Sequence, residues 1–549
     1  MKHIIMFLKL FFPLFLLGNS YSFAQPKTFH GETESKALKY RRISLNGVKP
    51  LLFLQTIKDA QKLNFNSIEV QLERGTLLPI KSLAQTDKQY NLIKAAHDAK
   101  LGVYVWIHEF EDIPEKWQNS NVANPYYNEK NDKGNKFINK DNTELWTWLE
   151  NKYENIIKII PDVDGYVLTL SESQYWATGD EEVTFKTVQT IYNVLKRHNK
   201  KLVYRTFCYS PQQMELLSKV ARRLPKDIVL EAKEVPQDWH FYLPYGPDIG
   251  SFPDHEQIIE LDVAGEYWGR SLLLNAFPEY IIARLGYYVH KKNAQGIVVR
   301  IDRFNEEVRN TFNDINLYAA VAFMNNPLVQ TEDIWKQWAK NKFGNQAADI
   351  AIRCLKPTWE ATKQTIYTKG YIISDRRAAM SFIKGFDDKP FNPHYWDKSY
   401  EPVWTKIQHP TESFILETVE EKTRAVNALD KSLLLLETNK TLFVDSVYQE
   451  LNFQLQRSKI TLNIYSLISE IMLRYQLINQ SVDQELKQKQ WERLREIAKE
   501  LKPLRAKLDE EHIVNGKSKK LQFYLTDIKT SVYDKFDSIL VNEHFKETP

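Results

Sequence analysis

Acidic, basic and aromatic residues recur at the ends of short apolar runs in this sequence. The segment KEVPQDWHF (233–241) follows the apolar run IVLEA and carries Lys233 and, five residues later, Asp238. Two other segments place a carboxylate beside aromatic residues: TLSESQYW contains Glu172, and GEYWGR contains Glu266. A protonated carboxyl group and an ionised carboxylate can act together as general acid and general base. That chemistry requires a fold that brings distant segments to one place.

The region from about residue 40 to residue 330 alternates apolar, strand-like runs with amphipathic helical segments. The runs are almost continuously apolar, as expected for parallel strands that are buried on both faces. Eight strand–helix units of this length predict an α/β fold, a (β/α)8 TIM barrel, and a doubly wound open sheet is the alternative. The predicted strands are residues 41–45, 66–70, 102–108, 165–170, 201–207, 227–233, 258–263 and 296–301.

In such a barrel, reactive groups lie where the strands end and the loops to the next helix begin. Three adjacent units contribute Glu172, Asp238 and Glu266, so we expect these carboxylates to converge on one rim. For Glu109 and Asp302, a helix cap or a solvated loop residue is an equally good interpretation. Other side chains at the predicted strand ends are Trp106, His108, Tyr175, Trp176, Arg205, Lys233, Trp239, His240, Trp268, Arg300 and Arg303.

Several other catalytic chemistries lack their motifs. The sequence contains no HExxH, CxxC, GxSxG, Walker or GxGxxG motif, and we expect neither a metal nor a cofactor. His240 and His255 are interpreted as hydrogen-bonding residues rather than metal ligands. Carboxylates beside aromatic faces remain, and glycoside hydrolysis uses one carboxyl group on each side of the scissile bond.

The chain changes character after about residue 335. Residues 433–473 place apolar positions at helical spacing, and residues 483–512 form a charged helical pattern that we expect Pro503 to interrupt. The sequence therefore predicts a catalytic barrel over residues 25–335 and an all-α C-terminal domain over residues 336–549. The apolar stripes of that domain can pack on the barrel or on a second copy of the chain, which would give a homodimer.

The first residues resemble a signal peptide. Lys2 and Lys9 make a basic start before the apolar stretch LFFPLFLLG, and SYSFA ends at Ala24 with a small-residue pattern typical of cleavage. Removing residues 1–24 lowers the formal net charge from +4 to +2. We expect an exported, periplasmic or secreted protein with no membrane span after cleavage. Interspersed charges argue against nucleic-acid binding, and Cys208 and Cys354 are expected to be free thiols.

At these residues the chain resembles the α-glucuronidases of glycoside hydrolase family 67. IIPDVDGYVLTLSES is similar to the family's fourth-strand segment and LVYRTF to its fifth. KEVPQDWHF resembles the sixth-strand segment, where a lysine precedes an aspartate by five residues, and GEYWGR resembles the QEY-G motif. NDINLYAAVAFMNNP (313–327) is similar to the segment after the eighth strand. The resemblance runs in order over roughly residues 90–345.

The resemblance implies an α-glucuronidase-like hydrolase that cleaves α-linked, uronic-acid-bearing oligosaccharides or polysaccharides with inversion. Glu172 would be the general acid, Asp238 the base, and Glu266 a second candidate base. We expect Tyr175 and Trp176 to keep Glu172 protonated near neutral pH, and the two acting carboxyl groups to lie roughly 6.5–9.5 Å apart. The implied substrate-binding residues are Arg205 and Lys233 as a carboxylate clamp, with Trp106, Trp239, Trp268, Tyr175 and His240 around the sugar.

The chain also departs from the family pattern. The family has a β-rich domain before its barrel, whereas only residues 25–40 precede the first predicted strand here. Leu168 stands where the family has another lysine, Ser173 follows the acid, and DWH replaces DFQ. Two alternatives therefore stay open: a glycosidase of the same fold for a neutral or different sugar, and a non-catalytic carbohydrate-binding barrel.

Overall fold

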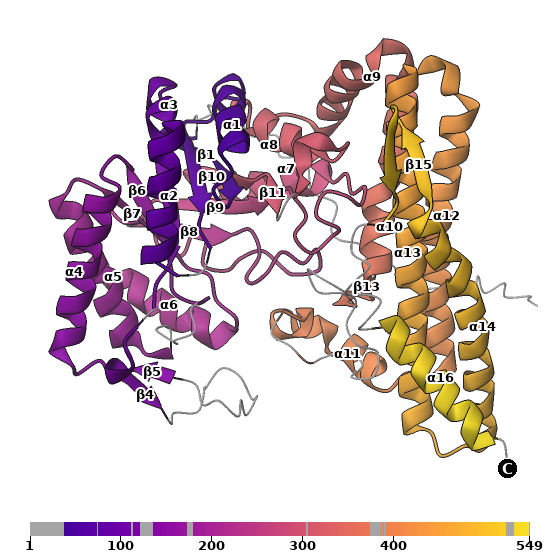
Figure 1. The fold of residues 1–549 in the computed structure, drawn as a ribbon. Coiled ribbons are helices and arrows are strands. Elements are labelled where there is room, and N and C mark those ends of the chain that lie inside the picture. The colour runs from indigo at the N-terminus through magenta and orange to yellow at the C-terminus, as the bar shows by residue number, and fades with distance from the viewer. Residues whose placement is uncertain are drawn as a thin grey trace, which may run out of the picture. The chain divides into compact units, whose positions relative to one another are not determined.

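A closed barrel of eight parallel strands forms the N-terminal part of the fold (Figure 1). The computed structural model describes residues 38–73, 75–110, 113–120, 136–172, 179–303, 306–373, 386, 388, 391–522 and 532–547. All eight predicted strands are confirmed, with ends that shift by at most two residues. They are β1 (Tyr40–Asn46), β2 (Ser67–Gln71), β3 (Gly102–His108), β6 (Gly165–Thr169), β7 (Lys201–Arg205), β8 (Val229–Lys233), β9 (Gln257–Asp262) and β10 (Gly296–Arg300).

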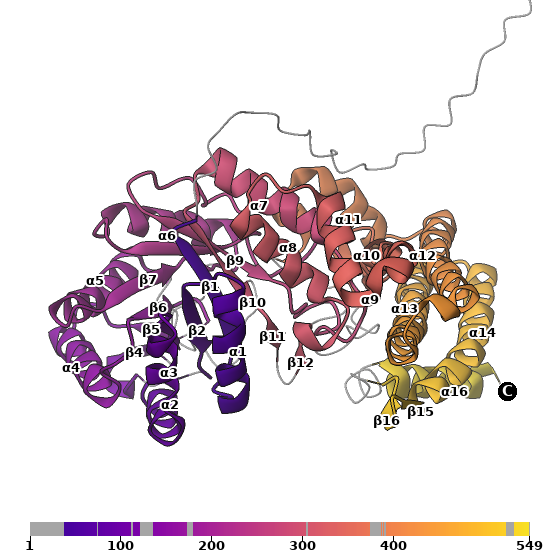
Figure 2. The same cartoon turned by 90° about the horizontal axis from the view of Figure 1, so that it is seen from above.

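Helices surround these strands, as Figure 2 shows from above. Their sequences carry local start signals: Asp180 accepts hydrogen bonds from the first amides of α5, and Ser210 caps α6 ahead of Pro211. The predicted (β/α)8 barrel is therefore confirmed. Its helices are α1 (Pro50–Lys62), α2 (Leu77–Tyr90), α3 (Leu92–Asp98), α4 (Thr143–Ile159), α5 (Glu181–Arg197), α6 (Pro211–Arg223), α7 (Pro278–Lys292) and α8 (Asp314–Asn325).

Alternate residues of each strand face opposite sides of the barrel wall. Val167 and Val203 belong to the apolar cluster inside the barrel, whereas their neighbours Leu168 and Tyr204 belong to the larger cluster that includes the surrounding helices. Leu168 is fully buried in that outer layer. The residue therefore faces away from the barrel interior and gives no information about the charge of a bound sugar.

One connection between consecutive barrel strands lacks the helix that the strand–helix pattern predicts. Residues 234–256, between β8 and β9, contain turns and bends but no helix. The physical reason is composition, because this segment holds four prolines and two glycines, which disfavour a continuous helix. The segment is Pro-rich at Pro236, Pro244, Pro247 and Pro253, and it carries Asp238 and His240.

The C-terminal part is mostly helical, as predicted. Helices α12, α13 and α14 lie side by side (Figures 1 and 2). The predicted interruption at Pro503 is wrong, since α14 continues through it. Pro503 is exposed, so water can satisfy the carbonyl that lacks its amide partner. The helices are α9 (Thr331–Leu355), α10 (Pro357–Ile366), α11 (Glu401–Gln408), α12 (Glu412–Thr438), α13 (Asp445–Gln480), α14 (Gln484–Asp509) and α16 (Asp534–Glu547).

Short antiparallel strand pairs form separate two-stranded sheets outside the barrel sheet. The pair β15 (Glu511–Val514) and β16 (Lys517–Lys520) turns through Asn515 and Gly516, both with positive φ. The other pairs are β4 (Gln118–Ser120) with β5 (Lys136–Ile138), β11 (Asp302–Arg303) with β12 (Glu306–Glu307), and β13 (Tyr367–Thr368) with β14 (Tyr371–Ile372).

Residues 36–549 form one compact unit, so the predicted boundary between residues 335 and 336 stays a prediction, as does a homodimer. The predicted signal peptide, residues 1–24, lies outside the described residues. Within the described ranges, no helix combines the length and apolar character needed to cross a bilayer. Cys208 and Cys354 are buried free thiols, as expected.

Candidate active site

The last residues of several barrel strands meet at the carboxyl-terminal rim. Arg205 ends β7, Lys233 ends β8, Asp262 ends β9 and Arg300 ends β10, and all four side chains are buried. Parallel pairing of neighbouring strands places these ends at the same side of the barrel. Charged side chains at the ends of four barrel strands therefore lie at the same rim.

Glu172, the predicted general acid, lies between two basic side chains just beyond β6. Its Oε2 is 3.1 Å from Nη1 of Arg205 and 3.6 Å from Nε2 of His108. Burial raises the pKa of Glu172, but His108, Arg205 and Lys233 outweigh that effect and hold the pKa well below its usual value. These contacts favour the ionised form of Glu172 in the free protein, which is opposite to the protonated form that we expected near neutral pH.

The physical reason for this difference is that two basic side chains, His108 and Arg205, reach Glu172 from other strands. Tyr175 and Trp176, which we expected to desolvate Glu172, lie outside the described residues. His108 ends β3 and Arg205 ends β7, on either side of β6 in the barrel. Their contacts with the carboxylate outweigh burial and lower the pKa of Glu172.

Asp238, the predicted base, forms a close ion pair with Lys233. Its Oδ1 accepts a hydrogen bond of 2.5 Å from the Lys233 ammonium group. That ammonium lies 3.7 Å from the centre of the Phe207 ring and 4.0 Å from that of Trp239, a cation–π arrangement. Burial raises the pKa of Asp238, but the Lys233 charge outweighs it and keeps the pKa below its ordinary value. Asp238 is therefore ionised, as a general base must be.

Glu266, the second candidate base, is held by two arginines. Its Oε2 is 3.3 Å from Nη1 of Arg300, and its Oε1 is 2.5 Å from Nη2 of Arg303. The loop that presents it is shaped by Asp262, whose carboxylate accepts hydrogen bonds from the amides of residues 264, 265 and 266. The side chain of Glu266 is 4% exposed, against 19% for Asp238. Asp238 is thus the more accessible carboxylate for a water molecule.

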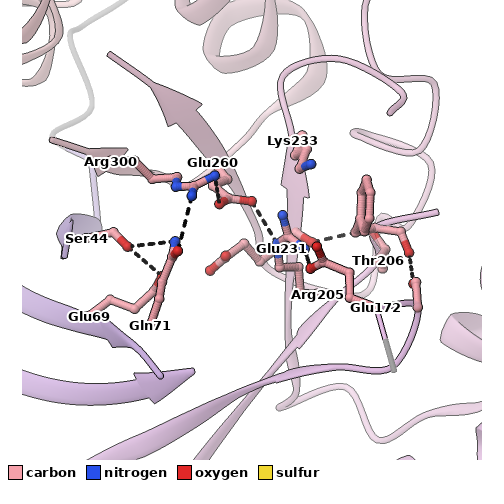
Figure 3. Close-up of polar contacts among 12 residues, drawn as sticks. Ser44, Glu69, Gln71, Glu172, Arg205, Thr206, Glu231, Lys233, Glu260 and Arg300 are labelled. Atoms are coloured by element: carbon pink, nitrogen blue, oxygen red, sulfur yellow. Dashed lines mark hydrogen bonds and ion pairs between the residues drawn. The ribbon is translucent and has the colours of Figure 1, made fainter. Parts of the chain in front are cut away.

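A buried carboxylate inside β9, Glu260, links the arginines of this site. Its Oε2 accepts a hydrogen bond of 2.7 Å from Nε of Arg205, and its Oε1 is 3.7 Å from Nη1 of Arg300. Arg300 also donates to Gln71, which donates to Ser44 (Figure 3). Figure 3 shows these contacts as one chain that ends at Glu172. The sequence reasoning missed Glu260 because it lies within an apolar strand.

A second charged layer lies deeper in the barrel. Nη1 of Arg42 is 3.0 Å from Glu69 and 3.3 Å from Glu231, and all three side chains are fully buried. Burial raises the pKa of Glu231 well above its usual value, and the nearby carboxylates Glu69 and Glu260 add to this. The interior therefore favours a protonated Glu231, which reduces the charge beneath the rim.

The predicted sugar-stacking tryptophans lie in different surroundings. The Arg205 guanidinium is 4.3 Å from the centre of the Trp106 ring, and that of Arg300 is 4.4 Å from Trp239. Trp268 instead stacks on Phe241 at 3.9 Å within an aromatic cluster. Trp106 and Trp239 thus adjoin the charged site, whereas Trp268 packs in a core. Their roles with a sugar stay predictions, and Tyr175 lies outside the described residues.

His240 follows Asp238 closely but contacts the C-terminal part. Its Nδ1 is 3.1 Å from the hydroxyl group of Tyr367 in β13, and its ring lies 5.5 Å from that of Phe391. Burial lowers the pKa of His240 to about 4, so the imidazole is neutral at ordinary pH. The contact shows that β13 adjoins the loop that carries the candidate base.

Glu109, Asp302 and His255 all have structural partners. Glu109 is buried and accepts hydrogen bonds from Lys152 and Tyr153 of α4. Asp302 accepts from Asn46 and Lys49, which ties the end of the barrel to its beginning. Both carboxylates are buried, so neither is the helix cap or solvated loop residue that was one interpretation, and both form structural contacts within the barrel. His255 bonds to backbone carbonyls, and the described residues contain no cluster of side chains suited to a metal ion.

The chain forms a parallel eight-stranded (β/α)8 barrel with carboxylates and cations at its carboxyl-terminal rim, where barrel enzymes place their active sites. The prediction of a glycoside hydrolase is confirmed by the family comparison. Residues 125–325 match the model of the glycosyl hydrolase family 67 middle domain, and this range includes all three candidate carboxylates. The resemblance seen in the sequence is therefore confirmed for this part of the chain.

One solved structure has a similar fold over most of this chain. A GH138 enzyme targeting pectin rhamnogalacturonan II aligns with 93% of this chain and 67% of its own length, at 11% identity and a TM-score of 0.59. A family GH115 4-O-methyl-α-glucuronidase with specificity for decorated arabinogalactans aligns with 84% of this chain and 58% of its own length, at 12% identity and a TM-score of 0.44. No curated protein matches the sequence.

Proposed function

We propose that this protein hydrolyses an α-linked glycosidic bond in a uronic-acid-bearing carbohydrate with inversion of configuration. Glu172 acts as the general acid and Asp238 as the general base. The observation that carries the proposal is the match of residues 125–325 to the family 67 middle domain, together with the position of both carboxylates at the barrel rim. Export through the predicted signal peptide belongs to the same proposal.

The mechanism assigns one task to each charged group. Glu172 donates a proton to the leaving oxygen, and Asp238 removes one from the water that attacks the anomeric carbon on the opposite face. Lys233 keeps Asp238 ionised through the 2.5 Å hydrogen bond and fixes its position. Arg205 lies within reach of Glu172 and supplies the charge that a sugar carboxylate would bind.

A second candidate, hydrolysis of a neutral sugar by the same acid–base pair, has one observation in its favour. Within the described ranges, Arg205, Lys233, Arg300 and Arg303 all have carboxylate partners. An anionic sugar must therefore compete with protein carboxylates, whereas a neutral sugar need not.

The purified chain is expected to hydrolyse aryl α-glucuronides or uronic-acid-bearing oligosaccharides faster than matched neutral α-glycosides. Hydrolysis is followed as released phenol or reducing sugar, and proton NMR at early times identifies the first anomer formed. Inversion gives the β-anomer of the released sugar. A faster reaction with neutral glycosides contradicts the uronate preference, and the α-anomer as first product contradicts the inverting mechanism.

The choice of base is tested by comparing Asp238→Asn with Glu266→Gln. We expect Asp238→Asn to lower kcat by about 10²- to 10⁴-fold for substrates with any leaving group, since water activation is lost. Glu266→Gln is expected to lower kcat less, because two arginines already bind this carboxylate. Circular dichroism and thermal melting check that both variants fold. The reverse order of effects would assign the base to Glu266.

A further inference from the structure

Within the described residues, the rim cations Arg205, Lys233, Arg300 and Arg303 each pair with a carboxylate, and two of these carboxylates are accessible. Glu260 is completely buried and Glu266 is 4% exposed, whereas Glu172 is 22% and Asp238 is 19% exposed. An incoming anion can therefore displace only Glu172 from Arg205 or Asp238 from Lys233. Displacement of Asp238 would disturb the base and its 2.5 Å hydrogen bond. The longer 3.1 Å contact of Glu172 is the weaker one.

Arg205 is placed so that it stays in position when Glu172 leaves. Its Nε donates to the buried Glu260, and its guanidinium packs against the rings of Trp106 and Phe207 at 4.3 Å and 4.9 Å. These contacts fix the plane of the guanidinium group independently of Glu172. Nη1 can then exchange the Glu172 carboxylate for another carboxylate without moving the arginine.

We propose that a uronate binds Arg205 in place of Glu172, and that Glu172 takes up one proton from solvent as it is displaced. The inference rests on the proposed function, because it requires an anionic sugar. The Arg205–Glu172 ion pair breaks, an Arg205–uronate pair forms, and one proton moves to a carboxylate oxygen of Glu172. Substrate binding thereby produces the protonated general acid that the free protein lacks.

The other charged groups around Glu172 favour its protonation when a uronate binds. Once Arg205 is shared with a substrate anion, an ionised Glu172 would be a second negative charge beside it in a largely buried site, which disfavours the ionised form. His108, 3.6 Å away, remains as a contact for the carboxyl group. The charged and titratable groups that act on Glu172 are His108 from β3, Arg205 from β7, Lys233 from β8, Asp238 from the following loop and Arg300 from β10.

The inference predicts a specific pH dependence of binding. The contacts of the free protein hold the pKa of Glu172 well below its usual value. The proposed loss of the Arg205 contact to the uronate would raise this pKa in the complex. Between these two pKa values the complex holds one more proton than the free protein. The dissociation constant for a uronate should therefore rise about tenfold per pH unit in that range.

Isothermal titration calorimetry of the full chain with sodium D-glucuronate, in buffers of different ionisation enthalpy, measures the protons taken up. We expect about one proton per bound glucuronate near neutral pH, and none with D-glucose. The matched variant Glu172→Gln lacks the titrating group and the competing charge. It should bind glucuronate more tightly than the wild type at pH 7, with no proton uptake and no pH dependence.

The outcomes separate this inference from the proposed function. Glucuronate binding without proton uptake, or with uptake that persists in Glu172→Gln, overturns the inference and leaves the uronate preference intact. Absence of glucuronate binding by the folded protein, while a neutral glycoside is hydrolysed, overturns both. Uptake of one proton by the wild type and none by the variant supports the proposal.

Discussion

Replacing Glu172 with glutamine is expected to lower kcat by about 10²- to 10⁴-fold on a substrate whose leaving group is a sugar, because the leaving oxygen then departs without a proton. The loss should be much smaller for an aryl glycoside with an acidic phenol, since that leaving group needs no protonation. Initial rates with both substrates give the two ratios.

The Glu172→Gln experiment has a control variant, and one result would contradict the role of Glu172 as the acid. Glu182→Gln removes a carboxylate that pairs with Arg223 at the surface of the barrel, and its rates should match those of the wild type. Equal losses for the sugar and phenol leaving groups in Glu172→Gln would show that Glu172 does not act as the acid.

Replacing Glu260 with glutamine is expected to lower the free energy of unfolding by about 3–5 kcal/mol, because the buried guanidinium groups of Arg205 and Arg300 lose a charged partner. Both arginines and Glu260 are almost completely inaccessible to water. Denaturant unfolding followed by tryptophan fluorescence reports on the barrel, where Trp106 and Trp239 adjoin these arginines.

The matched control for this variant lies just before the same strand. Glu256 pairs with Lys39, and their side chains are 39% and 58% exposed. Since exposed ion pairs contribute little, Glu256→Gln should lower the free energy of unfolding by at most about 1 kcal/mol. Equal effects of the two substitutions would contradict the importance of the buried network.

The barrel could be predicted from sequence because its strands are compact apolar runs separated by helical patterns, and parallel strands place their ends together. The same logic placed Arg205 and Lys233 at the rim. It missed Glu260 and Glu231 because each lies within an apolar run. The two-residue periodicity of a strand could have identified both glutamates. Glu260 precedes Asp262 by two residues and Glu231 precedes Lys233 by two residues, so each glutamate lies on the same inward face as the charged residue that ends its strand.

The protonation of Glu172 could not be predicted from its neighbours in sequence. The contacts that decide it come from His108 and Arg205, which are distant in the chain and meet Glu172 only when the barrel closes. The β15–β16 hairpin, in contrast, had a local signal that was overlooked. Asn515 and Gly516 adopt the positive φ values that a two-residue hairpin turn requires.

The proline-rich connection between β8 and β9 has a consequence for how the site meets its substrate. Prolines restrict the backbone before folding as well as after it, so this segment has less conformational freedom to lose than an ordinary loop of its length. In the proposed mechanism, the Asp238 carboxylate would thus be held near its working position before a sugar binds. Little of the sugar's binding free energy is needed to order this loop, and more remains to favour the transition state.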